Sequence, residues 1–207
     1  MIKLCGIRRR EDVNIVNEFL PDFIGMILTE GFRRTVDVDT AEELSRLLDK
    51  RIKKVGVFVN EPAENVQTAA SRLDLQVIQL HGDEDRKYIR SLNVKCEIWK
   101  AVRVRSSKDI VNAEKLGCHR LLLDSFVKNS VGGTGVVADW DIIKNTKISL
   151  PYFLAGGIGE DNIAAALEIC PNIDLSGSVE TDGVKDREKV RRITELYRNL
   201  TQKGIQI

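Results

Sequence analysis

Short apolar segments alternate with charged segments along the whole chain. Eight of the apolar segments are nearly continuous in apolar, often β-branched residues, which is typical of parallel strands buried on both faces. They are Ile2–Cys5, Phe23–Leu28, Val55–Val59, Val77–Leu80, Ile98–Val104, Leu121–Asp124, Tyr152–Ala155 and Ile173–Ser176. The pattern predicts eight short parallel strands.

The charged segments between them carry apolar residues at helical spacing. In Ala41–Leu48 the leucines recur three and four positions apart, and Thr40 before them is of a type that caps helices. Asn162–Ile169 and Asp186–Leu200 show the same spacing. Alternation of strands and helices predicts a parallel α/β sheet.

Eight strand–helix units predict a closed (β/α)8 barrel, or TIM barrel, which we expect to occupy residues 1–207 as a single, compact catalytic domain. The alternative is an open doubly wound sheet, which usually has five or six strands and a glycine-rich phosphate motif after the first. Here Cys5-Gly6-Ile7-Arg8 follows the first strand and lacks that motif. The barrel is therefore favoured.

The composition is that of an ordinary globular protein. With 32 basic and 31 acidic residues and only 5% aromatics, the chain lacks the basic excess and stacking surface of a nucleic-acid binder. No apolar run approaches the roughly 20 residues that span a bilayer. No signal peptide is visible, and the four scattered cysteines include no CxxC pair. We therefore expect a cytoplasmic protein with no nucleic-acid or membrane partner.

Barrel active sites lie at the carboxyl ends of the strands, and phosphate sites commonly follow strands seven and eight. Those two ends are rich in glycine, which lets a phosphate approach backbone N–H groups. The residues concerned are Gly156, Gly157, Ser176, Gly177 and Ser178. We predict phosphate binding there, although glycines that only form tight turns would give the same pattern.

Two further strand ends carry groups for acid–base chemistry. Cys5 ends the first strand and Asp124 the sixth, which places them on opposite sides of the barrel mouth. A thiolate can remove a proton and a carboxylic acid can donate one, the combination that isomerises a sugar. A buried apolar role for Cys5 and a helix-capping role for Asp124 are equally good interpretations of their positions alone.

Several short fragments stand in a characteristic order along the whole chain. They are Lys3–Ile7 with Arg9 and Glu11–Asp12, Gly56–Asn60, Gln79–Glu84, Lys100–Val104, Leu123–Ser125, Gly132–Gly135 with Asp139–Trp140, Leu154–Ile158, and Asp174–Ser176 before Val179–Thr181. Together they resemble the phosphoribosylanthranilate isomerase family of tryptophan biosynthesis. The resemblance implies an Amadori rearrangement of N-(5-phosphoribosyl)anthranilate to an aminoketose, with no metal or cofactor.

The resemblance also implies roles for individual residues. Asp124 would be the general acid that protonates the furanose ring oxygen, and Cys5 the general base that takes the proton from the sugar C2. Arg34 aligns with an arginine near the anthranilate carboxylate, while His81 and Asp174 match positions near the substrate. The glycine and serine residues after strands seven and eight would hold the phosphate.

The chain departs from the family pattern in two places near these residues. The family commonly has Ser-Pro-Arg after strand two, where this chain has Phe32-Arg33-Arg34. Either Arg33 or Arg34 is therefore a candidate carboxylate ligand, and alignment on Val36 favours Arg34. The family's Ser-Ser-Gly after strand eight appears here as Ser-Gly-Ser, which can shift individual phosphate contacts.

Three other roles would use the same scaffold. A structural or interaction barrel would not need two phosphate-type loops. The histidine-pathway isomerase performs the same chemistry on a different aminoaldose, but it resembles a barrel with a catalytic Asp where this chain has Cys5. A non-catalytic phosphosugar-binding protein would be marked by loss of Cys5 or Asp124, and both are present. We expect a small phosphosugar substrate and a monomer or homodimer.

Overall fold

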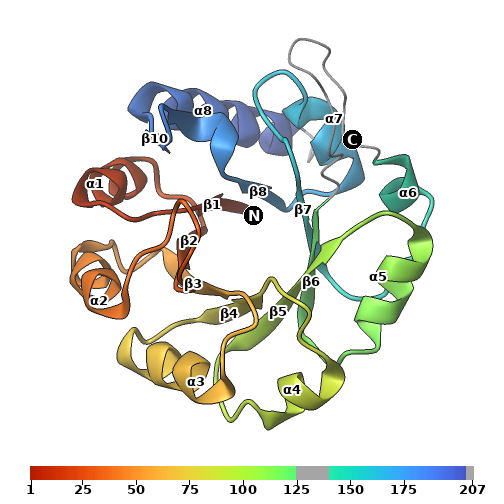
Figure 1. Ribbon diagram of the computed structural model, residues 1–207. Helices are drawn as coiled ribbons and strands as arrows, with labels where there is room; N and C mark the ends of the chain where they lie inside the picture. Colours follow the sequence, from red (N-terminus) through yellow and green to blue (C-terminus); the bar gives the residue numbers. More distant parts are fainter. Residues whose placement is uncertain (125–139, 204–207) are drawn as a thin grey trace.

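Eight parallel strands form a closed barrel at the centre of the part of the molecule that the structure describes (Figure 1). The computed structural model describes residues 1–124 and 140–203. The strands are β1 (Ile2–Cys5), β2 (Phe23–Ile27), β3 (Lys53–Phe58), β4 (Val77–Leu80), β5 (Glu97–Arg103), β6 (Arg120–Asp124), β7 (Tyr152–Ala155) and β8 (Ile173–Leu175). They pair in chain order, and β8 pairs with β1 to close the ring. The predicted (β/α)8 barrel is confirmed.

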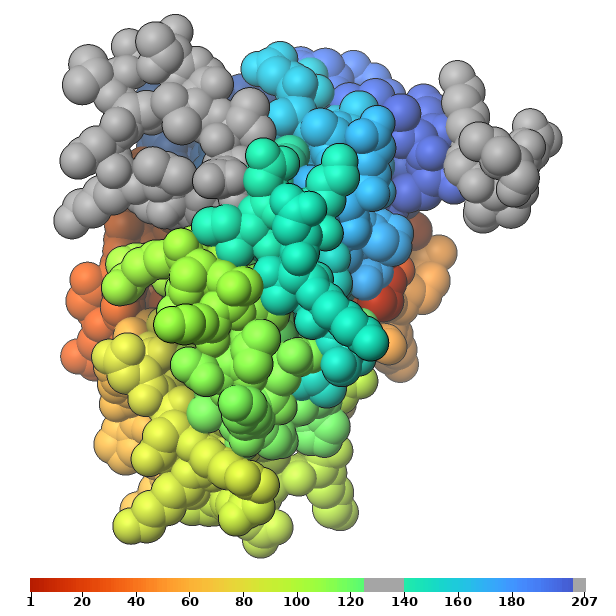
Figure 2. All heavy atoms as spheres, turned by 90° about the vertical axis from the view of Figure 1, so that its right-hand side faces the viewer, coloured from red at the N-terminus to blue at the C-terminus, as the bar shows by residue number. Residues whose placement is uncertain are grey.

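Helices surround the strands in chain order, so that α8 lies next to α1 (Figure 1). They are α1 (Arg10–Phe19), α2 (Val38–Leu47), α3 (Ala63–Arg72), α4 (Arg86–Ser91), α5 (Ser107–Glu114), α6 (Asp141–Lys144), α7 (Ile163–Ile169) and α8 (Arg187–Lys203). Figure 2 shows one side of this layer, where green, teal and blue segments follow one another across the surface. The helix predicted over Ala41–Leu48 begins earlier, because Asp37 rather than Thr40 caps it: the Asp37 carboxylate accepts from Thr40 N at 2.8 Å.

The strands bury side chains on both faces, as their continuous apolar character predicts. Outward residues such as Leu4, Ile78 and Leu121 pack beneath the helices. Inward residues form a separate cluster inside the barrel. Within it the rings of Trp99 and Phe153 stack with centroids 4.8 Å apart, and Phe23 meets both edge-on. The interior formed by these described residues is therefore a packed core.

A small hairpin follows β8 and lies against the barrel mouth. A short 3-10 helix, η1 (Gly177–Val179), leads into β9 (Glu180–Thr181), which pairs antiparallel with β10 (Val184–Lys185). The turn between them uses left-handed backbone at Asp182 and Gly183, with φ of 51° and 79°. No feature of the apolar pattern predicted this hairpin.

Candidate active site

A cavity of about 690 Å³ opens at the carboxyl ends of the strands. Its volume lies in the range of pockets that hold small-molecule ligands. All ten residues predicted for the site line it: Cys5, Arg34, His81, Asp124, Gly156, Gly157, Asp174, Ser176, Gly177 and Ser178. Ser125, Gly132–Gly135 and Asp139, part of the family resemblance, lie outside the described residues. The geometry thus brings together the predicted residues from six different strand ends.

Cys5 and Asp124 occupy the last positions of their strands. β1 and β6 lie three strands apart around the closed ring, so that the thiol and the carboxyl reach the cavity from different walls. Cys5 is buried and belongs to the cluster inside the barrel, whereas Asp124 is half-buried. An acidic and a basic group on different walls can protonate one atom of a bound sugar and deprotonate another.

Asp174 is held by a buried lysine. Lys3 Nζ donates to Asp174 Oδ1 at 2.9 Å, and the Lys3 side chain is entirely buried. Burial by itself lowers the pKa of the Lys3 ammonium, but Asp174 and Cys5 raise it by more, so the net shift is upward from 10.5. Lys3 is thus a charged group behind the cavity-lining residues Cys5 and Asp174.

Gly25 on β2 makes room for this arrangement. A Cβ atom at Gly25 would lie 2.8 Å from Cys5 Sγ and 3.1 Å from Lys3 Nζ. Both atoms therefore crowd against the same stretch of bare backbone. Any side chain there would displace the thiol, the ammonium or both.

His81 follows β4 directly and faces the cavity. Gln79 Nε2 lies 2.9 Å from His81 Nδ1, and with the amide N–H donating, the ring carries its proton on Nε2. The ring is open to the cavity, yet the surrounding protein still desolvates it and lowers its pKa from 6.5; the Asp124 carboxylate acts in the opposite direction. His81 is consequently a neutral ring above pH 6.5.

The two predicted phosphate turns both contribute to the cavity. Gly156 and Gly157 follow β7 with φ of 93° and 67°, a left-handed backbone that favours glycine. The seventh helix begins only at Ile163, so the turn itself, and not the start of that helix, faces the cavity. On the other side Ser176 Oγ donates to the Cys5 carbonyl at 3.3 Å and joins the ends of β8 and β1.

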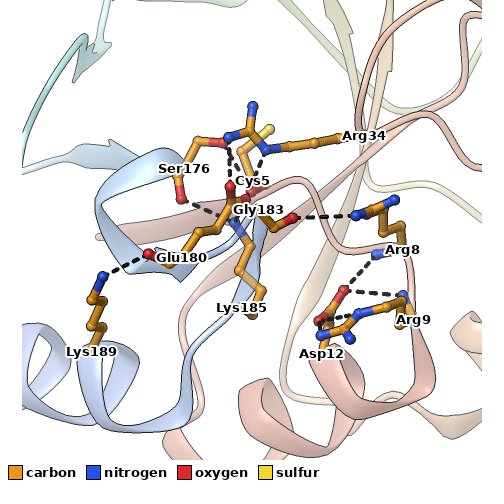
Figure 3. Close-up of polar contacts among 10 residues, drawn as sticks. All are labelled: Cys5, Arg8, Arg9, Asp12, Arg34, Ser176, Glu180, Gly183, Lys185 and Lys189. Carbon is orange, nitrogen blue, oxygen red and sulfur yellow. Dashed lines mark hydrogen bonds and ion pairs between the residues drawn. The ribbon is translucent and has the colours of Figure 1, made fainter.

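Of the two candidate arginines, Arg34 lines the cavity. Its guanidinium makes two bonds to the Glu180 carboxylate, from Nε at 2.8 Å and from Nη2 at 2.6 Å (Figure 3). The Arg33 guanidinium packs against Gly183 in the hairpin turn. The geometry therefore favours Arg34, in agreement with the alignment on Val36.

Four residues near these groups escaped the sequence-based list of site residues. Lys3, Glu180 and Lys185 are buried charges that hold site residues in place, and Phe32 is a cavity-lining side chain with 47% of its surface exposed. The position of Lys3 two residues before Cys5 on one strand was the available signal, because such residues share a face. Glu180 stands in the Val179–Thr181 fragment of the family resemblance but was assigned no role, and Lys185 gave no signal.

Two features are absent from the part of the chain that the structure describes. No group of three or more His, Cys, Asp or Glu side chains there is placed to hold a metal ion. Among the same residues, no helix combines the length and apolar character needed to cross a membrane.

The fold and this cavity define a (β/α)8-barrel enzyme with its site at the carboxyl ends of the strands. The chain belongs to the N-(5'-phosphoribosyl)anthranilate (PRA) isomerase family, whose sequence model matches residues 2–196. It is thus an isomerase, and the resemblance inferred from its sequence fragments is confirmed.

Individual relatives agree over nearly the full length. The chain is 38% identical over 201 residues to a PRA isomerase of Thermoanaerobacter sp., and 41% identical over 201 residues to one of Caldanaerobacter subterraneus; each alignment covers 96% of this chain and 98% of the relative. A solved PRA isomerase from Thermotoga maritima superposes with a TM-score of 0.83 at 27% identity, covering 96% and 98%. Another solved PRA isomerase structure, which superposes with a TM-score of 0.81, is in complex with reduced 1-(o-carboxyphenylamino)-1-deoxyribulose 5-phosphate.

Proposed function

We propose that this protein converts N-(5-phosphoribosyl)anthranilate to 1-(2-carboxyphenylamino)-1-deoxy-D-ribulose 5-phosphate, with Asp124 as general acid and Cys5 as general base. The observation that carries the proposal is the convergence of all ten predicted site residues on one cavity, in a chain of the PRA isomerase family. A solved relative binds a reduced form of this product, which supports the same ligand class here.

The rearrangement begins with ring opening. The Asp124 carboxyl gives its proton to the furanose ring oxygen, the bond from that oxygen to C1 breaks, and the nitrogen lone pair forms a C1=N double bond. The product of this step is an open-chain Schiff base with a new hydroxyl on C4. A positioned acid of this kind contributes a rate factor of about 10²–10⁴.

The second step moves a proton from C2. The Cys5 thiolate removes it, the electron pair forms a C1=C2 double bond, and the iminium nitrogen becomes a neutral amine. The resulting enolamine tautomerises to the C2 ketone as C1 gains a proton and the C2 hydroxyl loses one, so that atoms and electrons balance overall. The Lys3 ammonium beside Cys5 compensates the negative charge of the thiolate inside the barrel.

Binding groups surround these two residues. The turns at Gly156–Gly157 and Ser176–Ser178 would take the phosphate through backbone N–H groups. Arg34 would take the anthranilate carboxylate, because a guanidinium fork matches a carboxylate. His81, neutral at pH 7, would donate a hydrogen bond to the sugar, and Asp174 would contribute to the wall on the β8 side.

The proposal extends to the setting of the enzyme. We infer that residues 1–207 form one catalytic domain and act in the cytoplasm without a cofactor. We also propose that the protein is a monomer or a homodimer; a solved relative from Thermotoga maritima is described as dimeric.

The decisive experiment follows turnover of freshly prepared phosphoribosylanthranilate by the fluorescence of its anthranilate ring. The parent protein is expected to consume the substrate, and Cys5→Ser and Asp124→Asn are each expected to lose a factor of about 10² or more in kcat. Cys96→Ser is the matched control, since Cys96 lies before β5 at the opposite end of the barrel.

Two results would contradict the assignment. Near-parental kcat for Cys5→Ser would remove Cys5 from its role as base. A folded parent protein without turnover would refute the proposed substrate, and the histidine-pathway aminoaldose would be the next compound to assay.

A further inference from the structure

A buried charge network holds the arginine at the cavity. Glu180 begins β9, and Lys185, its register partner on β10, donates to Glu180 Oε1 at 2.8 Å and to the Ser176 carbonyl at 3.1 Å. Arg34 binds both oxygens of the same carboxylate, Oε1 through Nε and Oε2 through Nη2 (Figure 3). The side chains of Lys185 and Glu180 are 1% and 5% exposed, whereas that of Arg34 is 25% exposed. Only the arginine therefore reaches the cavity.

The contacts of Arg34 leave one fork of its guanidinium available. Glu180 occupies the side formed by Nε and Nη2, two of the five N–H donors. Among the described residues, no acceptor bonds to Nη1. The end formed by Nη1 and the second N–H of Nη2 is a second fork, and it has the spacing that a carboxylate needs.

Glycine residues leave space for the Arg34 side chain where it crosses the mouth of the barrel. A Cβ atom on Gly6 would lie 2.6 Å from Arg34 Cδ, and one on Gly177 would lie 3.7 Å from its Nη2. Arg34 thus extends from the loop after β2 over Gly6 to the end of β8. Glycine at position 6 leaves the space for this path.

The hairpin that carries Glu180 is itself fixed at several points. Arg8 Nη2 donates to the Gly183 carbonyl at 3.2 Å, and Lys189 Nζ donates to the Glu180 carbonyl at 2.7 Å (Figure 3). Thr181 Oγ1 donates to Asp186 Oδ2 at 2.7 Å. Glu180 is therefore a rigid anchor for Arg34.

The charges of the network also favour an anion. Arg34 and Lys185 carry two positive charges and Glu180 one negative charge, which leaves a net charge of +1 beside the cavity. Without Glu180, two cations in a poorly hydrated site would repel each other, and Arg34 would turn toward solvent. With Glu180, one positive charge remains, in a fixed orientation.

We propose that Glu180 is a positioning residue for substrate selectivity: it orients the free fork of Arg34 so that the cavity selects an aminoaldose whose aromatic ring bears an ortho carboxylate. Lys185 supports it by holding the carboxylate from behind. This inference rests on the proposed function, because it takes Arg34 as the carboxylate ligand, and it adds a residue that neither the sequence nor the family resemblance assigned a role.

The test compares two ligands and two matched variants. The ligands are reduced 1-(o-carboxyphenylamino)-1-deoxyribulose 5-phosphate and the same compound with an unsubstituted phenyl ring. Glu180→Gln is compared with Glu84→Gln, because Glu84 is a second buried carboxylate, paired with Lys100 at 3.0 Å. Dissociation constants are measured by calorimetry with the full-length chain.

We expect Glu180→Gln to weaken binding of the carboxylated ligand by about 10- to 100-fold, the value of a charge-assisted contact. Binding of the phenyl ligand should change less than about threefold, and KM for the substrate should rise more than kcat falls. Glu84→Gln should affect the two ligands equally. If Glu180→Gln does not fold, Glu180→Asp keeps the charge but withdraws it from Arg34, and the same selective loss is expected.

Two outcomes would overturn the inference, and a third separates it from the proposed function. In the first two, the parent protein prefers the carboxylated ligand, but Glu180→Gln weakens binding of both ligands equally or of neither. Either result would show that Glu180 has only a structural role. A parent protein that binds both ligands equally would instead refute the role of Arg34 in the proposed function, and with it this inference.

Discussion

Replacing Asp174 by asparagine tests whether its main partner is Lys3. The substitution keeps an oxygen that accepts from Lys3 Nζ, 2.9 Å away, but removes the charge opposite a fully buried ammonium. Removing one partner of a buried ion pair costs about 3–5 kcal/mol. Because the Asp174 side chain is 10% exposed and the amide still accepts a hydrogen bond, we expect the lower end, about 3 kcal/mol.

Urea unfolding at pH 7, followed by tryptophan fluorescence and far-UV circular dichroism, measures this loss. The double variant Lys3→Met, Asp174→Asn should be more stable than Asp174→Asn alone, because it leaves no unpaired buried charge. The pKa of Lys3 is raised in the folded state, so the stabilising contribution of its charge is complete at neutral pH and is lost only as pH rises beyond 10.5. The cost of Asp174→Asn should shrink in that range.

The competing possibility is that Asp174 acts only on the substrate. Asp174→Asn would then lose less than about 1 kcal/mol of stability, the cost typical of a solvated pair, while KM rose. The stability losses of Lys3→Met and Asp174→Asn, each measured alone, would also add up to the loss of the double variant. Either result would refute the ion-pair argument.

Two other predictions follow from the packing and charge of the site. Gly25→Ala should lower kcat and cost about 1–3 kcal/mol, since its Cβ would lie 2.8 Å from Cys5 Sγ; unchanged kinetics would show that the thiol has room to move. Desolvation raises the pKa of Glu180, but its two cationic partners lower it by more, to about 2. The ionised carboxylate therefore contributes its full stabilisation of the fold above pH 4.5, and this stabilisation is lost as pH falls toward 2. The stability difference between the parent and Glu180→Gln, measured by urea unfolding, should therefore narrow between pH 6 and pH 3, and a constant difference would contradict the pairing.

The strands could be predicted because a barrel strand is buried on both faces. Ile2–Cys5, Val77–Leu80 and Tyr152–Ala155 have the predicted bounds. β3 begins two residues before the apolar run, since Lys53 and Lys54 already pair with β2 although neither lysine side chain is buried. Backbone pairing between strands continues past the last buried side chain, and the apolar pattern therefore does not predict the full length of the strand.

The apolar pattern could not predict the short helices or the hairpin. α4 and α6 have six and four residues, too few to repeat an apolar face. The strands of the hairpin have two residues each, and their position depends on tertiary contacts with Arg8 and Lys189. In both cases the element is too short for local sequence propensity to predict it.

The predicted site rests on a geometric rule, and the rule explains both why the predicted residues line one cavity and why other residues were left out. In a parallel barrel every strand ends at one rim, so a polar residue at the end of a strand reaches the cavity whatever its distance in sequence. The rule says nothing of the charges behind that rim. Lysine and glutamate are ordinarily solvent-exposed, and a sequence alone therefore places Lys3 and Glu180 at the surface.

Closure of the ring reverses that expectation. β1 pairs with β8, which sets Lys3 opposite Asp174 across 171 positions of sequence, and the hairpin beyond β8 returns Glu180 to Arg34 across 146. Lys3 and Asp174 lie at the seam where the first and last strands meet, and Arg34 reaches the hairpin beyond β8 from the loop after β2. A buried cation is tolerated there because its carboxylate comes from the other end of the chain. The two ion pairs beside the predicted site residues thus depend on barrel closure, because each joins residues from distant parts of the chain.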